Sequence, residues 1–381
     1  MKISIITLHR VRNYGSSLQT LATQSFFKKA GFDVEVIDYY PERYTSIGLL
    51  KRLKNKSSKL QNNALLLFAA RVIMSVSYVK KKIVFDSFLK RHIRLSARTY
   101  RNESDLKRYK LDSDAFCTGS DQVWNSHWNE GIDRPLYLSF VPADKYKFSY
   151  ASSIGNEILD ETEAKEVSKL LAEYRYISVR EKEGVKVLDT IGLKSVQMLD
   201  PTLLFSSKFW DRYTTGRYRN KRYIVTYNLH HDKKVDELAH KLAKKYGVKV
   251  YNISYNIHDI IRKGTLKWCP SVEDYLDLIK NAEYVVTDSF HATVFSIIFH
   301  TKFFSIYPEQ ASSRIRSILN LTGLEGRAAE SVPDVNSLSE MIDFKKADLV
   351  LIKERKKAAI YVKRISAELR ALYNEEYCNN G

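Results

Sequence analysis

The residue best placed to do chemistry is His291, in the stretch TDSFHATVF. The run Tyr284 to Thr287 before it is typical of a buried strand, and the apolar residues after Ser289 recur as in a buried helix. His291 is therefore predicted in the first turn of a helix, just beyond the carboxyl end of a strand. Ligands collect at that edge of an open α/β sheet, because unpaired backbone amides there attract anions. The histidine could transfer protons there, or it could only cap the helix or close the edge of the core.

Two further polar stretches occupy the same kind of junction. In NYGSSLQ, Gly15 and Ser16 begin a predicted helix, whose backbone amides could hold a phosphate or a carboxylate or serve in plain helix capping. In TGSDQVWN, the carboxylate of Asp121, the amide of Gln122 and the indole of Trp124 follow a buried strand. Sugar hydroxyls need paired acceptors and pyranose faces stack on aromatic rings, so this loop could bind a sugar. The alternative is a turn anchored by a tryptophan in the core.

Arginines near two other junctions could bind an anion. Arg180 ends a predicted strand in SVREKEG, where its guanidinium could hold an anion bidentately or pair with Glu181 or Glu183. Arg314 and Arg316 surround another helix start in SSRIRSILNLTG, which also favours an anion.

Several other kinds of chemistry find no support in the sequence. His230 and His231 are adjacent, but no second ligand pair has the spacing of a metal site, so no metal is predicted. The three cysteines are widely spaced and form no CxxC, which argues against a disulfide framework and a structural zinc. The chain has no GxSxG, Walker A or GxGxxG motif, so a serine hydrolase, a P-loop enzyme and an ordinary dehydrogenase fit poorly.

The elements that must position these residues form two alternating series. The first forty residues predict a strand, a helix and a second strand, which must pair in parallel because the helix is the crossover. A second series of strands and helices begins near Arg222 and leads to the segment of His291. Two doubly wound α/β domains are therefore predicted, at residues 1–203 and 204–346, with a cleft between them.

Two basic segments lie outside these series. Residues 44–110 are basic and mainly helical in pattern, which predicts an insertion in the first domain. The tail, residues 347–381, is predicted to be a basic helix that could pack back on the first domain. The formal net charge of +18 favours an anionic partner.

The insertion carries the strongest concentration of positive charge. KRLKNKSSKL (51–60) and VKKK (79–82) flank an apolar segment, residues 64–78, that is short for a membrane span and suits a buried or interfacial helix. Such a segment could hold the protein on an anionic membrane surface, or it could be a solvated basic face. Nucleic acid has the least support, because no zinc-finger, RNP or helix-turn-helix pattern is present. The apolar run at the N-terminus is too short for a signal peptide, so we expect the protein in the cytoplasm, free or at the inner face of the membrane.

An ordered set of motifs resembles the polysaccharide pyruvyl transferase family. The motifs are NYGSSLQTLA, FCTGSDQVWN, SYASSIG, ISVREKEGVKVLDTIG, MLDPTLLF, VVTDSFHATVFSIIF and SSRIRSILNLTGLEGR, spread over residues 13–327. The resemblance implies two Rossmann-like domains arranged as in GT-B glycosyltransferases. It also implies phosphoenolpyruvate as donor substrate with no further cofactor, and a sugar of a surface polysaccharide or of its lipid-linked precursor as acceptor. The product would be a pyruvate ketal that bridges two hydroxyls.

The resemblance also implies roles for individual residues. His291 would shuttle protons as general acid and base, and Asp121 would accept a proton from the acceptor hydroxyl. Because the donor carries a phosphate and a carboxylate, its site needs cations and amides, and the residues expected there are Arg180, Arg314, Arg316, Gly15, Ser16 and Ser289. The residues expected at the acceptor are Asn13, Tyr14, Gln122 and Trp124.

The sequence departs from the family pattern at one position of the expected donor site. Many relatives resemble Arg-Leu-His where this chain has Ser289, Phe290 and His291, so an arginine expected near the donor is missing. Arg314 or Arg316 could replace it.

Two other functions stay open. A GT-B glycosyltransferase that uses a nucleotide sugar would need the same fold and the same anion-binding cleft. A non-enzymatic protein that binds membrane surfaces or nucleic acid would rest on the basic charge alone. Ligands distinguish the three, since phosphoenolpyruvate, a nucleoside diphosphate or neither would stabilise the folded protein.

Overall fold

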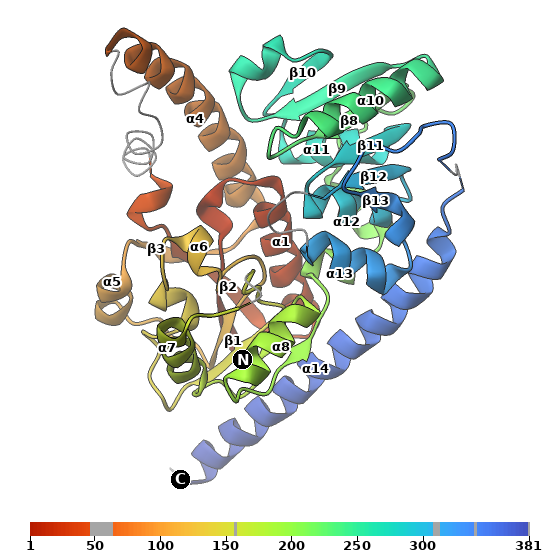
Figure 1. The fold of residues 1–381 in the computed structure, drawn as a ribbon. Helices are drawn as coiled ribbons and strands as arrows, with labels where there is room; N and C mark the ends of the chain where they lie inside the picture. The colour runs from red at the N-terminus through yellow and green to blue at the C-terminus, as the bar shows by residue number, and fades with distance from the viewer. Residues whose placement is uncertain (46–63, 156–157, 308–312, 339–340, 380–381) are drawn as a thin grey trace.

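The first domain is built on a parallel sheet of five strands in the order β3-β2-β1-β4-β5 (Figure 1). The computed structural model describes residues 1–45, 64–155, 158–307, 313–338 and 341–379. The strands of this sheet are β1 (Lys2–Ile6), β2 (Asp33–Tyr39), β3 (Leu95–Tyr100), β4 (Ala115–Thr118) and β5 (Tyr146–Ser149). Helix α1 (Tyr14–Lys29) is the crossover from β1 to β2, as the apolar spacing of the sequence predicts.

The second domain contains a parallel sheet of six strands in the order β10-β9-β8-β11-β12-β13. Its strands are β8 (Tyr223–Tyr227), β9 (Lys249–Ser254), β10 (Thr265–Trp268), β11 (Tyr284–Thr287), β12 (Phe303–Ile306) and β13 (Ala328–Ala329). The helices of this domain are α10 (Lys233–Tyr246), α11 (Val272–Lys280), α12 (Phe290–Phe299) and α13 (Ser313–Thr322). Because every pairing is parallel, the carboxyl ends of the strands meet at one edge of the sheet.

Several short elements lie between the strands and helices of the two domains. β6 (Ser178–Val179) and β7 (Val196–Gln197) form a two-stranded sheet beside β5. The short helices are α5 (Glu103–Arg108), α6 (Ser126–Asn129), α7 (Glu161–Leu171), α8 (Lys182–Thr190) and α9 (Ser207–Trp210). The 3-10 helices are η1 (His9–Val11), η2 (Glu42–Tyr44), η3 (Arg134–Tyr137), η4 (Pro201–Leu204), η5 (Asp211–Tyr213), η6 (Ile257–Ile261) and η7 (Glu325–Arg327). The domain boundary predicted after residue 203 falls within η4.

The predicted helical insertion is shorter than the sequence suggested. Residues 64–92 do form a long helix, α4 (Ala64–His92), but Leu95–Tyr100 is the edge strand β3 of the first sheet. Leu95 pairs with Val36, and Thr99 pairs with Asp38. This pairing satisfies backbone groups of β2 that would otherwise form an open edge, so the insertion ends before residue 95. The basic stretch 51–60 lies outside the described residues.

The C-terminal helix α14 (Phe344–Asn379) runs along both domains (Figure 1). At its start, Leu351 packs into the core that includes the helices of the second domain. Further on, Tyr361 and Ile365 are buried against Phe27 and Phe148 of the first domain. The tail thus packs across the first domain, and it also joins that domain to the second.

A shared aromatic core holds the two domains together. The ring of Tyr14, at the start of α1, stacks on Tyr275 of α11 with centroids 4.1 Å apart and an interplanar angle of 3°. Its hydroxyl donates to the carbonyl of Pro270 at 2.8 Å. Phe85 of α4 packs on the same ring. In the part of the chain that the structure describes, no helix is both long and apolar enough to span a bilayer.

Candidate active site

His291 lies where the sequence predicts it, in the first turn of a helix beyond a strand end. β11 ends at Thr287, the Ser289 hydroxyl accepts a hydrogen bond from the Ala292 amide at 3.5 Å, and α12 begins at Phe290. The His291 side chain is buried, with 8% of its surface exposed. Ser289 caps this helix, and capping is enough to explain a serine at this position without a contact to the donor substrate.

The start of α1 meets His291 from the other domain. A Cβ atom added to Gly15 would lie 2.0 Å from Nδ1 of His291, so only glycine lets the imidazole pack this closely on the backbone. Asn13 caps α1 by accepting a hydrogen bond from the Gly15 amide at 2.8 Å. Ser16 then donates its hydroxyl to Oδ2 of Asp121 at 2.5 Å. The two predicted polar junctions of the first domain therefore meet beside His291.

Asp121 is held in an unusual backbone conformation. Its φ angle is +80°, in the left-handed region that costs free energy for a residue with a side chain. The carboxylate is buried and accepts two hydrogen bonds, from Ser16 and from the Gln122 amide at 2.9 Å. Strain of this kind is common where a side chain must be aimed into a functional site.

Asp200 links His291 to Arg180. Its Oδ2 lies 3.6 Å from Nε2 of His291 and accepts a hydrogen bond from Nη1 of Arg180 at 3.1 Å. Burial alone would raise the pKa of the Asp200 carboxyl, but the imidazole and the guanidinium outweigh burial and hold that pKa well below its usual range. Sequence analysis did not select Asp200, although MLDPTLLF was among the motifs of the resemblance. The aspartate directly before a proline at the end of an apolar run was the available signal.

Arg180 directly follows β6 and forms the ion pair that the sequence left open. Its Nε donates to Glu181 at 2.7 Å, and its guanidinium carbon lies 4.6 Å from the ring centroid of Phe290. Its Nη2 is buried and has no hydrogen-bond partner among the described residues. One donor nitrogen therefore remains for a ligand.

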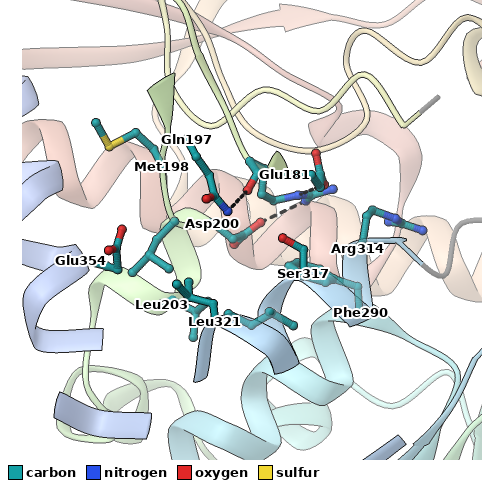
Figure 2. A pocket seen from close by; sticks show the side chains of 13 residues that line it. Glu181, Gln197, Met198, Asp200, Leu203, Phe290, Arg314, Ser317, Leu321 and Glu354 are labelled. Carbon is teal, nitrogen blue, oxygen red and sulfur yellow. Dashed lines mark hydrogen bonds and ion pairs between the residues drawn. The ribbon is translucent and has the colours of Figure 1, made fainter. Parts of the chain in front are cut away.

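A pocket opens beside this network (Figure 2). It lies between the loop that carries Asp200, helix α13 and helix α14, and its volume for the centre of a water molecule is about 20 Å³. Figure 2 shows Arg314 and Phe290 at one end of the pocket and Met198 and Glu354 at the other. His291 does not line this pocket; its imidazole is linked to the pocket wall through Asp200.

The two arginines of α13 have different surroundings. Arg314 lines the pocket, and among the described residues no carboxylate lies within ion-pair distance of it. Burial and the charge of Arg180 lower the pKa of Arg314 to about 10. Arg316 instead pairs with Glu330 at 2.6 Å and stacks on Tyr307 at the surface. The structure therefore does not bring Arg316 to the pocket that Arg314 lines, although both were expected at the donor.

Three buried nitrogen atoms of this region have no hydrogen-bond partner in the described chain. They are Nη2 of Arg180, Nε of Arg314 and Nε2 of His291. A buried donor without a partner costs free energy, so three of them in one region call for an explanation. An anion with several acceptor oxygens would supply the missing partners.

The predicted acceptor residues are not brought together as a sugar-binding surface. Trp124 is buried, donates Nε1–H to the carbonyl of Leu136 at 3.1 Å and stacks on Tyr137, so it is the core anchor of its turn. Tyr14 is buried in the aromatic core between the domains. Both rings are buried, so the structure does not place them at a surface where they were expected to contact a sugar. Asn13 and Gln122 remain partly exposed near the start of α1 and the Asp121 loop.

Comparison with known proteins gives a family match and a fold match. The sequence model described as polysaccharide pyruvyl transferase matches residues 13–310. No curated protein has a significantly similar sequence. Among solved structures, the UDP-N-acetylglucosamine 2-epimerase from Rickettsia bellii is 12% identical, with a TM-score of 0.48 over 96% of this chain and 98% of that one.

A second solved structure supports the fold assignment. MnaA from S. aureus, solved with UDP, is 10% identical, with a TM-score of 0.50 over 92% of this chain and 87% of that one. At such identity the likeness concerns the fold alone. The predicted arrangement of two Rossmann-like domains, as in GT-B enzymes, is confirmed.

Proposed function

The chain belongs to the polysaccharide pyruvyl transferase family, and from this premise we propose that it moves pyruvate from phosphoenolpyruvate onto two hydroxyls of a sugar. The resemblance seen in the sequence is confirmed by the family match over residues 13–310, and the family makes the protein a transferase. The proposed acceptor is a sugar of a surface polysaccharide or of its lipid-linked precursor, and the product is a ketal.

The observation that carries this proposal is the group of unpartnered buried nitrogens from Arg180, Arg314 and His291. Phosphoenolpyruvate has a phosphate and a carboxylate, whose oxygens would accept from the two guanidinium nitrogens, while its methylene carbon would face the imidazole of His291. Arg314 is the cation best suited to the donor, because it lines the pocket and no carboxylate lies within ion-pair distance of it in the described chain. Burial, and after it the charge of Arg180, lowers its pKa. Many relatives carry an arginine at the position of Ser289. In this chain, Arg314 would bind the donor instead of that arginine.

The residues around His291 suit the steps of ketal formation. His291 protonates the methylene carbon of the donor, so positive charge develops at C2 and a sugar hydroxyl attacks there. Asp121, already aimed by its backbone conformation, accepts the proton of that hydroxyl. The bond between C2 and the phosphate oxygen then breaks, and its electron pair leaves with the phosphate, which takes the proton that Asp121 received. The second hydroxyl attacks C2 and gives its proton to the imidazole of His291, which is neutral after the first step. Asp200 would hold the imidazole in place and stabilise its charged form.

Donor binding to matched arginine variants tests the proposal. In Arg314→Gln, the affinity for phosphoenolpyruvate measured by calorimetry should fall by about tenfold to a hundredfold, because a hydrogen bond to a charged group contributes about 1.5 to 3 kcal/mol. Arg316→Gln, on the same helix, should bind as the wild type does. Equal affinity in both variants would contradict the donor site. Stabilisation by a nucleoside diphosphate and not by phosphoenolpyruvate would support a nucleotide-sugar glycosyltransferase instead.

We also propose that the protein binds anionic membrane surfaces through α4. Three apolar residues of this helix are exposed to solvent. The exposed fraction is 48% for Val72, 52% for Val79 and 61% for Ile83. Lys82 lies among them and is exposed, whereas Lys80 and Lys81 lie over the rings of Trp268 and Tyr255. The basic stretch 51–60 precedes the helix in sequence. Exposed apolar side chains beside several lysines are typical of a helix that lies in the interface of an anionic bilayer. A protein so bound would meet lipid-linked acceptors at the inner face of the membrane.

A further inference from the structure

His230 and Asp288 form a second histidine–carboxylate pair at the edge where β8 and β11 end. The two strands are neighbours in the second sheet; Asp288 directly follows β11, and His230 lies three residues after the end of β8. Nδ1 of His230 lies 2.7 Å from Oδ2 of Asp288. The roles described above do not use this pair, and its histidine was considered in the sequence only as a metal ligand.

The Asp288 carboxylate is a fixed support for the imidazole. Its side chain is fully buried, and it accepts hydrogen bonds from the amides of Leu229 at 2.7 Å and His230 at 2.8 Å in addition to the ring contact. With Nδ1 turned to the carboxylate, Nε2 is the free nitrogen, and the His230 side chain is 49% exposed. A buried carboxylate that orients a half-exposed imidazole leaves one N–H directed outward for a ligand.

The charges around His230 favour an anion at that free nitrogen. His230 donates a hydrogen bond to Asp288, which raises the pKa of His230, and the nearby Asp232 acts in the same direction. The positive charge of Arg314 opposes this rise, so the imidazolium and the Arg314 guanidinium lie within electrostatic reach of each other. Arg314 is in turn within reach of Arg180. These cations of both domains therefore border one region.

We propose that His230, oriented by Asp288, binds the phosphoryl group of the donor as a charged hydrogen-bond donor together with Arg314. The identity of that donor rests on the proposed function, whereas the contact with a phosphoryl group does not. Positive charge at this position stabilises the negative charge that collects on the phosphate as it departs. The region of Arg180 and His291 is then left for the carboxylate and the methylene carbon.

Anion binding as a function of pH tests the inference. Calorimetry would measure the binding of inorganic sulfate, inorganic phosphate and phosphoenolpyruvate to the wild-type protein between about pH 5.5 and pH 8.5, the range in which histidine titrates. Sulfate keeps its charge throughout this range, so it separates the titration of the protein from that of the ligand. Because the imidazolium is the binding form, affinity should fall as pH rises through the raised pKa of His230.

Adjacent histidines provide matched variants. His230→Gln should bind sulfate and phosphate about tenfold to a hundredfold more weakly at the acid end of the range, and the pH dependence should disappear. His231→Gln should keep both, since His231 lies 4.0 Å from Asp259 and faces a different partner. Asp288→Asn should move the fall in affinity to lower pH, with the melting temperature recorded to verify folding.

The possible results separate this inference from the proposed function. Absence of sulfate and phosphate binding by the wild type, or an unchanged pH dependence in His230→Gln, would overturn the inference even if phosphoenolpyruvate binds. Phosphate binding that depends on His230, without any binding of phosphoenolpyruvate, would support the inference and contradict the proposed donor.

Discussion

At the scale of single residues, the contact between Gly15 and His291 determines how the candidate site is assembled. The imidazole comes from the second domain and lies directly on the backbone of α1 in the first. Asp200 touches the same ring from the segment that connects the domains. The position of the proposed acid and base thus depends on three segments that are far apart in the sequence.

Replacing His291 with glutamine tests its proposed role. A general acid or base contributes on the order of 10² to 10⁴ in rate, so we expect phosphate release with a suitable acceptor to fall at least about a hundredfold. Folding and much of the donor affinity should survive, because Arg180 and Arg314 are unchanged. A histidine that only completes the core would give the reverse pattern, with a lower melting temperature and nearly normal turnover.

Replacing Gly15 with alanine tests the close contact. The new Cβ would overlap the imidazole, so His291 must move and turnover should fall by up to about a hundredfold, the effect that a shift of about 1 Å can have in an active site. Overpacking should also cost about 1 to 3 kcal/mol in the free energy of unfolding. Gly326→Ala is the control, since nothing lies within 4 Å of a Cβ at Gly326. Normal turnover in Gly15→Ala would mean that the ring position is not critical.

At the scale of elements, α14 links the first domain to the pocket. Glu354 on this helix lines the pocket, and Nε of Arg355 donates to the carbonyl of Leu203 at 2.8 Å. Two turns further on, the helix is buried against the first sheet. A segment outside the family match, at residues 344–379, therefore supports a wall of the candidate site.

Two isoleucines on α14 give a matched pair of variants. Ile365 is fully buried, and Ile360 is 68% exposed. Ile365→Ala should lower the free energy of unfolding by about 2 to 5 kcal/mol, because it leaves a cavity in the packed core. Ile360→Ala should change it by about 0.5 kcal/mol or less. Denaturant unfolding measures both, and a small effect of Ile365→Ala would show that α14 adds little to the stability of the first domain.

At the scale of the whole molecule, the net charge of +18 and the exposed face of α4 bear on where the enzyme works. The second half of α4 is anchored, since Phe85, Phe88 and Leu89 are buried in the core shared by the domains. The exposed apolar residues Val72, Val79 and Ile83 lie before these anchors along the helix. A bilayer bound there would lie beside the interface of the two domains.

Vesicle co-sedimentation tests this arrangement. The protein should bind vesicles of phosphatidylcholine and phosphatidylglycerol in equal parts, and not vesicles of phosphatidylcholine alone. Binding should weaken steeply with salt, because charges are screened over about 10 Å at 0.1 M ionic strength. Ile83→Asp should weaken it, whereas Leu349→Asp, at an exposed site of α14, should not. Absence of binding at low salt, or self-association that Ile83→Asp abolishes, would contradict the membrane role.

The sequence by itself determined the two alternating series of strands and helices and the place of His291 at the start of α12, but not the edge strand β3. These features follow from apolar periodicity, helix caps and crossover connections, which are properties of neighbouring residues. The spacing of Arg314 and Arg316 in the sequence also indicates that their side chains point in different directions. Residues two apart on a helix point about 200° apart, so the two arginines could not both face one pocket.

Only the tertiary structure decided the partners of these residues. Trp124 and Tyr14 look like sugar-binding rings in a loop and at a helix start, but packing between distant segments buries both. Asp200 becomes important only because the segment before η4 passes between His291 and Arg180. Burial and ion pairing depend on which elements meet in space, and such meetings join residues separated by tens to hundreds of positions in the chain. The sequence therefore determined which side chains were available, and the packing of the two domains decided which of them form the site.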